Sequence, residues 1–405
     1  MTIERLPVRL GAVLLSCGLA VACGGGDDAP LNVKPSYVGN VTVTEYDGNT
    51  DDLLTAGLGR TGLASVLAPT IADPGQPTAA ELRRLAVYNN YRALVDMTTA
   101  GGYGRFYGPN IDTQGNDTLG EGRVPGVEFL AFSDDGSGQE NVTLLVQVPA
   151  NFNPDQPCIV TATSSGSRSV YGAISTGEWG LKRGCAVAYT DKGTSSTPHD
   201  LAGDTVARID GTRGTASDVG AQAAFRAPIS DTEREAFNAL LPNRLAFKHA
   251  HSQRNPEKDW GRYTLQAIEF ALYAINERHA NARDDGRRLR RYTARNTLVI
   301  ASSVSNGGGA AIAAAEQDAR GLIDGVAVAE PAVQLPEGLT IQVQRGSTMV
   351  TTLGKPLIDY TTHANLYQQC AALSSQLAGT PFQAAYAANF GFIAGNRCAS
   401  LRARG

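Results

Sequence analysis

Residues 297–310, TLVIASSVSNGGGA, decide the fold. An apolar, β-branched run from Thr297 to Ala301 leads straight into Ser303-Val304-Ser305-Asn306-Gly307, and glycines and alanines follow with the composition of a helix over 308–319. A strand that turns sharply into a helix at a serine is typical of the nucleophile elbow of serine hydrolases. The stretch therefore predicts an α/β fold with Ser305 as its candidate nucleophile.

The residues on either side of Ser305 support this interpretation. Such a turn crowds the positions two before and two after the serine, so both must be small, and here they are Ser303 and Gly307. The common pattern has glycine at the first position, and Ser303 is a mild departure from it. The turn exposes the hydroxyl, and the following helix start favours a developing negative charge. The alternative is a Ser/Gly-rich loop that only caps a helix.

An oxyanion hole needs two backbone donors, and both have candidates here. One is the amide after the nucleophile, Asn306, and the other comes from the loop after an earlier strand. Ser164-Ser165-Gly166-Ser167-Arg168 follows the apolar run 159–163, and its small residues let backbone approach a substrate carbonyl. We therefore assign Ser165 and Gly166 to the hole, and an ordinary polar turn remains the alternative.

Outward from this stretch, short apolar runs alternate with helical patterns. The expected strands are 159–163, 186–189, 297–301 and 323–329, and the expected helices are 261–279 and 308–319. Such an alternation predicts a buried, mostly parallel sheet with helices on both faces, as in α/β-hydrolases. Two further strands, 127–132 and 142–148, are predicted to form an antiparallel hairpin at a sheet edge. A helix over 78–98 is predicted to begin at Thr78, with Glu81 three residues on.

Composition divides the chain into four parts. Residues 1–22 have the pattern of a signal peptide, 23–120 form a loop-rich and helical segment, and 121–335 form the α/β core. Residues 336–405 lack the alternation of strand and helix patterns seen in the core and are predicted to be part of a cap insertion. We expect the sheet to be incomplete at the C-terminus, because further strands should follow 323–329.

The N-terminus predicts export. Arg5 and Arg9 precede an apolar stretch of 13 residues, Leu10–Ala22, which ends in a small-x-small cleavage pattern. That stretch is shorter than the roughly 20 residues a membrane-spanning helix needs. We expect a secreted protein, extracellular or periplasmic. Lipidation at Cys23 is the less favoured alternative, because Ala20 stands where a larger aliphatic residue is usual.

Cysteine use fits an oxidising compartment. Cys158, Cys185, Cys370 and Cys398 remain once the N-terminal cysteines are set aside, and four cysteines allow three pairings. Cys158 and Cys185 open consecutive strand-like runs that adjacent strands would bring together. Cys370 and Cys398 would then close the last loop. Free buried thiols are the alternative.

Charge and histidine content exclude several functions. The net charge of −4 has no basic block, so neither nucleic acid nor an anionic membrane surface is expected as a partner. His249-Ala250-His251 could supply two metal ligands, but a packed or substrate-lining pair is the commoner use of such residues. We expect no metal and no organic cofactor.

The triad partners of Ser305 are harder to place. The order in this fold class is serine, acid, histidine, and His363 alone among five histidines follows Ser305. A Glu330–His363 pair is one possibility, since Glu330 ends the strand after the elbow. We favour an acid and a base that lie beyond residue 405. On that view the 405-residue chain alone is expected to be poorly soluble and nearly inactive.

Several separated runs carry a family resemblance. They are DDLLTAGLG (51–59), RVPGVEFLAFSDDGSG (123–138), PCIVTATSSGSRSVYG (157–172), KHAHSQRNPEKDWG (248–261) and SVSNGGG (303–309). In these runs the chain resembles the exported D-(−)-3-hydroxybutyrate oligomer hydrolases of bacteria, over nearly its whole length after the signal. The resemblance implies a serine charge-relay esterase that cleaves short oligomers released by a polyhydroxybutyrate depolymerase. It places the family's nucleophile at Ser305.

Two alternatives remain open at this stage. A hydrolase resembling tannases or feruloyl esterases would act on an aromatic ester, and an inactive hydrolase scaffold would serve only as a secreted binding protein. Fluorophosphonate labelling separates an activated serine from the second alternative. Comparing hydroxybutyrate dimers with gallate esters separates the two esterases.

Overall fold

The computed structural model describes residues 30–134, 140–194, 197–248, 255–333, 342–350 and 357–404. The chain forms two compact units, of which the first ends at Ala332 and the second is Val333–Gly405. The predicted signal peptide, Cys23 and the expected boundary at 335/336 lie outside the described residues.

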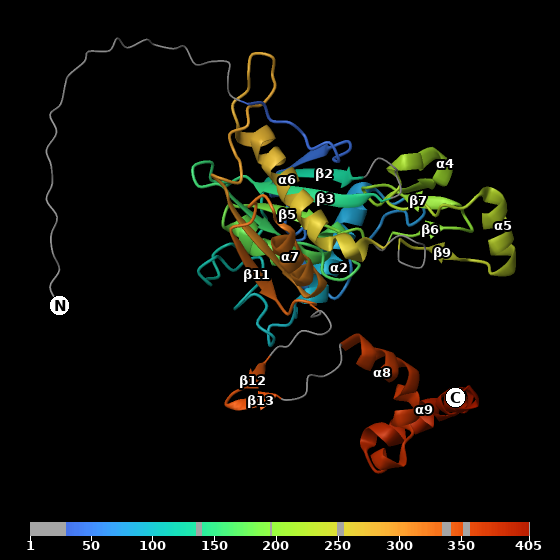
Figure 1. The fold of residues 1–405 in the computed structure, drawn as a ribbon. Coiled ribbons are helices and arrows are strands. Elements are labelled where there is room, and N and C mark those ends of the chain that lie inside the picture. Colours follow the sequence, from blue (N-terminus) through green and yellow to red (C-terminus); the bar gives the residue numbers. More distant parts are fainter. Residues whose placement is uncertain are drawn as a thin grey trace, which may run out of the picture. The chain divides into compact units, whose positions relative to one another are not determined.

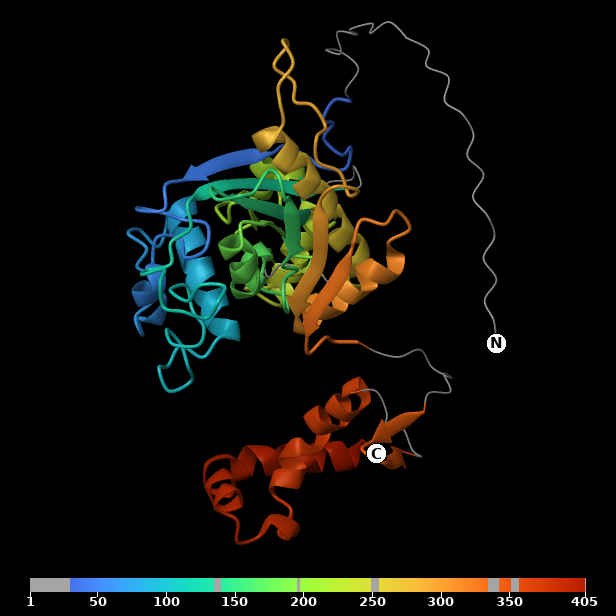
Figure 2. The ribbon, with the colours of Figure 1, turned by 90° about the vertical axis from the view of Figure 1, so that its left-hand side faces the viewer.

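The first unit is built around a seven-stranded sheet in the order β1-β2-β3-β5-β4-β10-β11. Its strands are β1 (Thr42–Tyr46), β2 (Gly126–Ser133), β3 (Val142–Pro149), β4 (Cys158–Thr161), β5 (Ala186–Thr190), β10 (Leu298–Val304) and β11 (Gly325–Ala329). Figure 2 shows β1 in blue at one edge and the orange strands β10 and β11 at the other. The strands expected from the apolar runs are all present.

The sheet is mixed, which corrects the expectation of a mostly parallel one. β5, β4, β10 and β11 run parallel, whereas β1, β2 and β3 are joined to each other and to β5 by antiparallel pairs. The predicted hairpin is β2–β3, but it does not form the edge. β1 pairs with β2, from Thr42 opposite Leu130 to Tyr46 opposite Gly126. On the other side of the hairpin, β3 pairs with β5.

Both faces of the sheet are covered, and this explains the unbroken apolar runs. Every residue of β3 is buried. Leu144, Val146 and Val148 belong to the core cluster that contains α6 (Trp260–His279), whereas Leu145 belongs to the cluster that contains α3 (Ile174–Lys182). Because side chains alternate along a strand, a strand buried on both faces needs apolar residues at successive positions.

The helices form a layer on each face (Figure 1). One layer holds α6 and α7 (Ser305–Gln317), and the other holds α2 (Ala79–Leu94) and α3. α6 and α7 approach closely at Gly261, where an added Cβ would lie 2.7 Å from the backbone of Ala313. The predicted start of α2 is confirmed by a capping box between Thr78 and Glu81.

A small four-stranded sheet in the order β8-β7-β6-β9 is inserted between β5 and α6. The short apolar stretches of residues 199–246 did not predict it. Its strands are β6 (His199–Asp200), β7 (Thr205–Ala207), β8 (Arg213–Thr215) and β9 (Leu245–Ala246), and α4 (Ala216–Val219) and α5 (Asp231–Leu240) accompany it. The remaining elements of this unit are α1 (Gly59–Ala64), η1 (Val170–Ala173), η2 (Gly220–Gln222) and η4 (Pro256–Asp259).

The second unit is a hairpin followed by helices, in place of the alternation seen in the core. Its elements are β12 (Val343–Arg345), β13 (Thr348–Val350), α8 (Leu357–Ala372), η5 (Ser375–Leu377) and α9 (Pro381–Ala403). A disulfide between Cys370 and Cys398 joins α8 to α9. None of the helices in the described ranges is both long enough and apolar enough to cross a membrane.

Both expected disulfides are confirmed. Cys158–Cys185 connects residues whose Cα atoms are 4.7 Å apart. Ile159 is paired with Ala186 in the β4–β5 ladder, so the two cysteines stand side by side one position earlier. Disulfides persist in oxidising compartments, which agrees with the export predicted from the N-terminus.

Candidate active site

Ser305 lies at the strand–helix junction that the sequence predicts. β10 ends at Val304 and α7 begins at Ser305 itself, three residues before the helix start expected from the glycines. The backbone at Ser305 has φ of +57°, a left-handed conformation that is uncommon for a residue other than glycine. Such local strain persists only where surrounding structure enforces it, and it concentrates at functional sites. The side chain is partly exposed.

The crowding expected two residues on either side of the serine is present. A Cβ on Gly307 would lie 2.1 Å from the carbonyl oxygen of Thr163 and 2.4 Å from Ser303 Oγ. Ser303 Oγ donates a hydrogen bond of 2.6 Å to that same carbonyl. Ser303, in place of the usual glycine, therefore connects the elbow by a hydrogen bond to the residues that follow the neighbouring strand β4. The absence of a side chain at Gly307 leaves room for this hydrogen bond.

The loop after β4 lies beside the elbow. β4 and β10 are neighbours in parallel register, with Ile300 opposite Val160, so their carboxyl ends meet at one edge of the sheet. Ser164 N donates to Thr190 O at 2.9 Å and fixes the start of the loop on the β5 side. The structure thus brings Ser165 and Gly166 to the same edge as Ser305 and Asn306.

Several amides at this edge have no acceptor among the residues that the structure describes. The first amides of a helix have no partner within the helix, and Asn306 N–H donates to no other described group. The amides of Gly166 and Ser167 likewise donate to no group among the described residues. Two unpaired amides from the loop and one from the elbow are the donor types that an oxyanion hole requires.

Side chains that the sequence interpretation missed hold the loop in place. Arg168 Nε donates to Ser165 O at 2.8 Å, and Lys192 Nζ donates to Gly166 O at 2.6 Å. Thr163 Oγ1 and Thr264 Oγ1 are 3.1 Å apart and hydrogen-bonded, which links the loop's start to α6. The position of Lys192 just after the strand 186–190, at the carboxyl edge of a parallel sheet, was the signal that could have pointed to it.

The histidines described by the structure are not bonded to Ser305. His199 is buried in the small sheet, where Nε2 lies 3.0 Å from Asp204 Oδ1 and Nδ1 accepts from Ala227 N. His279 ends α6, stacks on Phe152 at 4.7 Å, and has a pKa lowered by burial. His363 is exposed on α8 of the second unit and stacks on Tyr367. His249 and His251 lie outside the described residues.

Glu330 stands at the end of β11 with φ of +47° and an exposed side chain. Two residues later, Ala332 N donates to Ser305 O at 2.9 Å. The segment after β11 is therefore connected to the elbow by a backbone hydrogen bond. Within the described ranges, no group of three or more His, Cys, Asp or Glu residues is arranged to hold a metal ion.

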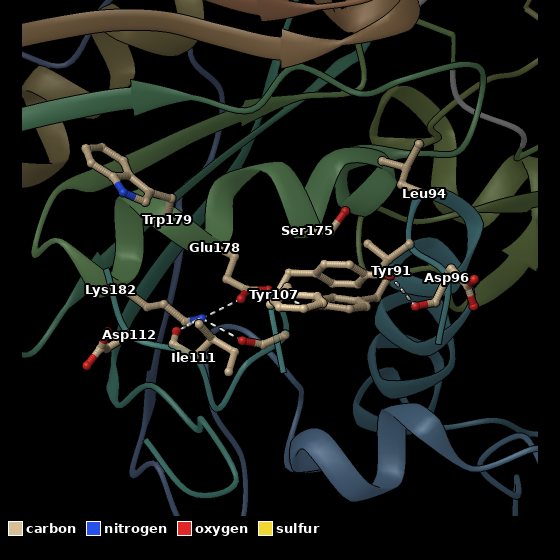
Figure 3. A pocket seen from close by; sticks show the side chains of 13 residues that line it. Tyr91, Leu94, Asp96, Tyr107, Ile111, Asp112, Ser175, Glu178, Trp179 and Lys182 are labelled. Carbon is tan, nitrogen blue, oxygen red and sulfur yellow. Dashed lines mark hydrogen bonds and ion pairs between the residues drawn. The ribbon is translucent and has the colours of Figure 1, made fainter. Parts of the chain in front are cut away.

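A cavity of about 490 Å³ lies on the outer side of α3 and contains none of the elbow residues (Figure 3). Its polar groups are bonded to one another. Lys182 Nζ donates to Gly108 O at 2.8 Å and also contacts Glu178, whose other carboxylate oxygen accepts from Tyr91. Because these groups are already paired, we interpret this cavity, called the α3 cavity below, as a structural contact between α2, α3 and the loop 106–112.

A larger cavity, of about 720 Å³, is lined by residues of β1, β2 and α2 and by the segment 169–171, and its lining contains none of residues 303–307. Its lining includes Ser169, Val170 and Tyr171, which directly follow the loop 164–168. Tyr171 hydroxyl donates to Glu128 at 2.9 Å, and Glu128 pairs with Arg83 at 3.4 Å, which makes one wall rigid. Ala80, at the start of α2, also lines this cavity and is exposed.

Comparison with known proteins gives one consistent result. The profile of the 3HB-oligomer hydrolase family matches residues 19–405. The chain is 60% identical over 406 residues to a D-(−)-3-hydroxybutyrate oligomer hydrolase of Paracidovorax citrulli, which covers 98% of this chain and 57% of that protein. It is 62% identical over 396 residues to the protein of the same name from Ralstonia pickettii, covering 96% and 55%.

The relative of that name from Paraburkholderia xenovorans is 57% identical over 404 residues, with 98% of this chain and 57% of that protein covered. The chain thus spans a little over half the length of these curated relatives. No solved structure matches it.

Proposed function

Because the chain belongs to the 3HB-oligomer hydrolase family, we propose that it is a serine esterase that hydrolyses D-(−)-3-hydroxybutyrate dimers and short oligomers to monomers. The family membership agrees with the resemblance found in the sequence. The proposal places the reaction at Ser305, in an α/β-hydrolase type of elbow, and needs neither a metal nor an organic cofactor.

In the proposed mechanism Ser305 Oγ attacks the ester carbonyl while a histidine takes its proton, since a neutral hydroxyl is a poor nucleophile. The carbonyl oxygen becomes an oxyanion that accepts hydrogen bonds from Asn306 N–H and from the amides of the 164–168 loop. The protonated histidine then gives its proton to the departing hydroxybutyrate alcohol. Water cleaves the acyl-enzyme by the same steps and releases the second product.

The observation that carries the proposal is the combination of strain and unpaired donors at one edge of the sheet. Ser305 is held at φ of +57°, and the amides of Asn306, Gly166 and Ser167 donate to no group in the described ranges. A structural turn would be expected to satisfy its amides internally, because unpaired donors weaken a fold. Donors left free beside a strained serine instead suit a charge that appears only during reaction.

The cavity of about 720 Å³ supports an oligomer rather than a small alcohol ester as substrate. Its wall of Ser169, Val170 and Tyr171 continues the loop that would bind the oxyanion. We propose that hydroxybutyrate units extend from Ser305 into this cavity. We also propose that the protein acts outside the cytoplasm after removal of residues 1–22, because its disulfides would be stable there.

Hydrolysis assays test the proposal. A version of the protein extended to the length of the curated relatives should release 3-hydroxybutyrate from the dimer and the trimer. In that version Ser305→Ala should lower kcat by at least about 10³-fold while leaving the thermal unfolding midpoint unchanged. Gallate esters should be poor substrates. Preferred cleavage of gallate would favour an aromatic esterase, and turnover that survives Ser305→Ala would exclude Ser305 as the nucleophile.

A further inference from the structure

Lys192 follows β5 and is the lysine whose ammonium group reaches the loop beside Ser305. Its residue is fully buried, at 0% exposure. Nζ donates to Gly166 O at 2.6 Å and to Thr194 Oγ1 at 2.9 Å, and it lies 4.8 Å above the centre of the Trp260 ring. Burying an ammonium group is costly unless strong partners compensate for lost water, so its position calls for an explanation.

No carboxylate in the described part of the chain forms a salt bridge with Lys192. The charge is therefore directed at a backbone carbonyl, a hydroxyl and an aromatic face. A buried lysine that only stabilised the fold would be expected to pair with an acid, as Lys182 does with Glu178. An ammonium without an acidic partner keeps more of its field available to a nearby negative charge.

Peptide geometry links this contact to the amides of the loop. In a trans peptide the C=O of one residue and the N–H of the next point in opposite directions, and the described residues contain no cis peptide. Lys192 holds Gly166 O, so Ser167 N–H points away from the ammonium. Arg168 holds Ser165 O in the same way, so Gly166 N–H points away from the guanidinium.

We propose that Lys192 is the positioning residue of the oxyanion hole: by binding Gly166 O, its ammonium group turns the Gly166–Ser167 peptide so that the unpaired loop amides face the oxyanion formed at Ser305. The inference rests on the proposed role of Ser305. It assigns Gly166 N–H and Ser167 N–H as the loop's donors to the oxyanion. Lys192 orients these donors without contacting the substrate itself.

The surroundings of Lys192 make this role dependent on pH. Burial lowers its pKa to about 8, with Arg168 acting in the same direction and Asp191 and Glu257 acting against it. Below that value the group is charged and binds the carbonyl strongly. As pH rises through it, the charge is lost and the hydrogen bond weakens. Trp260 and Thr194, the remaining groups in contact, do not titrate in this range.

The first experiment uses a version of the protein extended to the length of the curated relatives. It measures the second-order rate of Ser305 labelling by a small alkyl fluorophosphonate, whose phosphonyl oxygen occupies the oxyanion position. Lys192→Met should slow labelling by about 10- to 100-fold, because displaced donors stabilise the oxyanion less. Lys192→Arg keeps a permanent charge, so it should retain most of the rate. It should also remove the decline in rate that we expect of the wild type above about pH 8.

Lys182→Met is the matched control, since it removes another buried ammonium bonded to loop carbonyls and does so in the α3 cavity (Figure 3). It should lower the unfolding midpoint and leave the labelling rate unchanged. Equal slowing by both variants would show a general loss of stability, and an unchanged rate in Lys192→Met would overturn the proposal.

A second measurement separates this inference from the proposed function. Crystal structures of the wild type and of Lys192→Met should differ in the orientation of the Gly166–Ser167 peptide, whether or not Ser305 reacts. If Ser305→Ala and wild type are labelled alike, the nucleophile assignment fails, and the crystal structures alone decide on Lys192. An unchanged peptide orientation in Lys192→Met would contradict its positioning role.

Discussion

Two buried lysines occupy comparable positions and have opposite surroundings. Lys182, in the α3 cavity, donates to the carbonyl of Gly108 and is neutralised by Glu178 four residues earlier. Lys192, at the edge that holds Ser305, also donates to a loop carbonyl, but its other partners are a hydroxyl and an aromatic ring. Both ammonium groups bind a loop carbonyl. In the described part of the chain, only Lys182 of the two also forms a salt bridge, with Glu178.

This difference separates a structural contact from the proposed reactive site. Around Lys182 the donors and acceptors are bonded to one another, so little is left to bind a ligand. Around Lys192 the amides of Gly166, Ser167 and Asn306 have no acceptor in the part of the chain that the structure describes, and the backbone of Ser305 is strained. Unpaired donors and strain lower stability, and a protein retains them where a bound charge uses them.

Among the variants that test this comparison, the largest effect is expected from filling the space at the elbow. Gly307→Ala would place a methyl group 2.1 Å from Thr163 O, so the hydrogen bond from Ser303 Oγ to Thr163 O must break. We expect labelling of Ser305 to fall on the order of 10²-fold, as for small misplacements of catalytic groups. Gly395→Ala, on α9 where an added Cβ meets nothing within 4 Å, is the control and should leave the rate unchanged.

An intermediate effect is expected where the charge pair of the α3 cavity is broken. Glu178→Gln keeps the shape of the side chain and removes the salt bridge of Lys182. Lys182 then resembles Lys192, which forms no salt bridge with a carboxylate in the described ranges. Urea unfolding should show a free energy of unfolding lowered by about 1–3 kcal/mol, with no change in the labelling rate. A slower labelling rate would mean that the two regions are coupled and that the contrast drawn between them is wrong.

The smallest effect concerns the cavity of about 720 Å³. Ala80→Trp would fill part of it from the exposed start of α2, and we expect KM for the hydroxybutyrate trimer to rise about tenfold, a loss of roughly 1.4 kcal/mol of binding. Labelling by a small fluorophosphonate should stay constant. Asn89→Trp, on the exposed side of the same helix and outside the cavity lining, should change neither quantity.

Local patterns predicted those elements that local interactions determine. The capping box at Thr78, the hairpin β2–β3 and the long helix α6 follow from turn residues and periodicity near in sequence. The disulfide Cys158–Cys185 followed from two neighbouring strand-like runs. Ser305 at a strand–helix junction followed from small residues beside an apolar strand.

Features that depend on distant pairing could not be predicted in this way. The strand at Thr42–Tyr46 extends the hairpin and makes the sheet mixed, which only its pairing with β2 reveals. The small sheet over 199–246 has strands of two or three residues, too short for a periodic signal. Lys192 carries no motif of its own, and its role depends on a carbonyl that lies 26 residues earlier in the chain.

Covalent labelling identifies the reactive serine. A version of the protein extended to the length of the curated relatives is treated with a fluorophosphonate and digested, and the modified peptide is sequenced by mass spectrometry. We expect a single adduct on Ser305, in the peptide that contains 303–309, and no adduct in Ser305→Ala. An adduct on another serine, or labelling that is unaffected by Ser305→Ala, would contradict the assignment of the elbow as the reactive site.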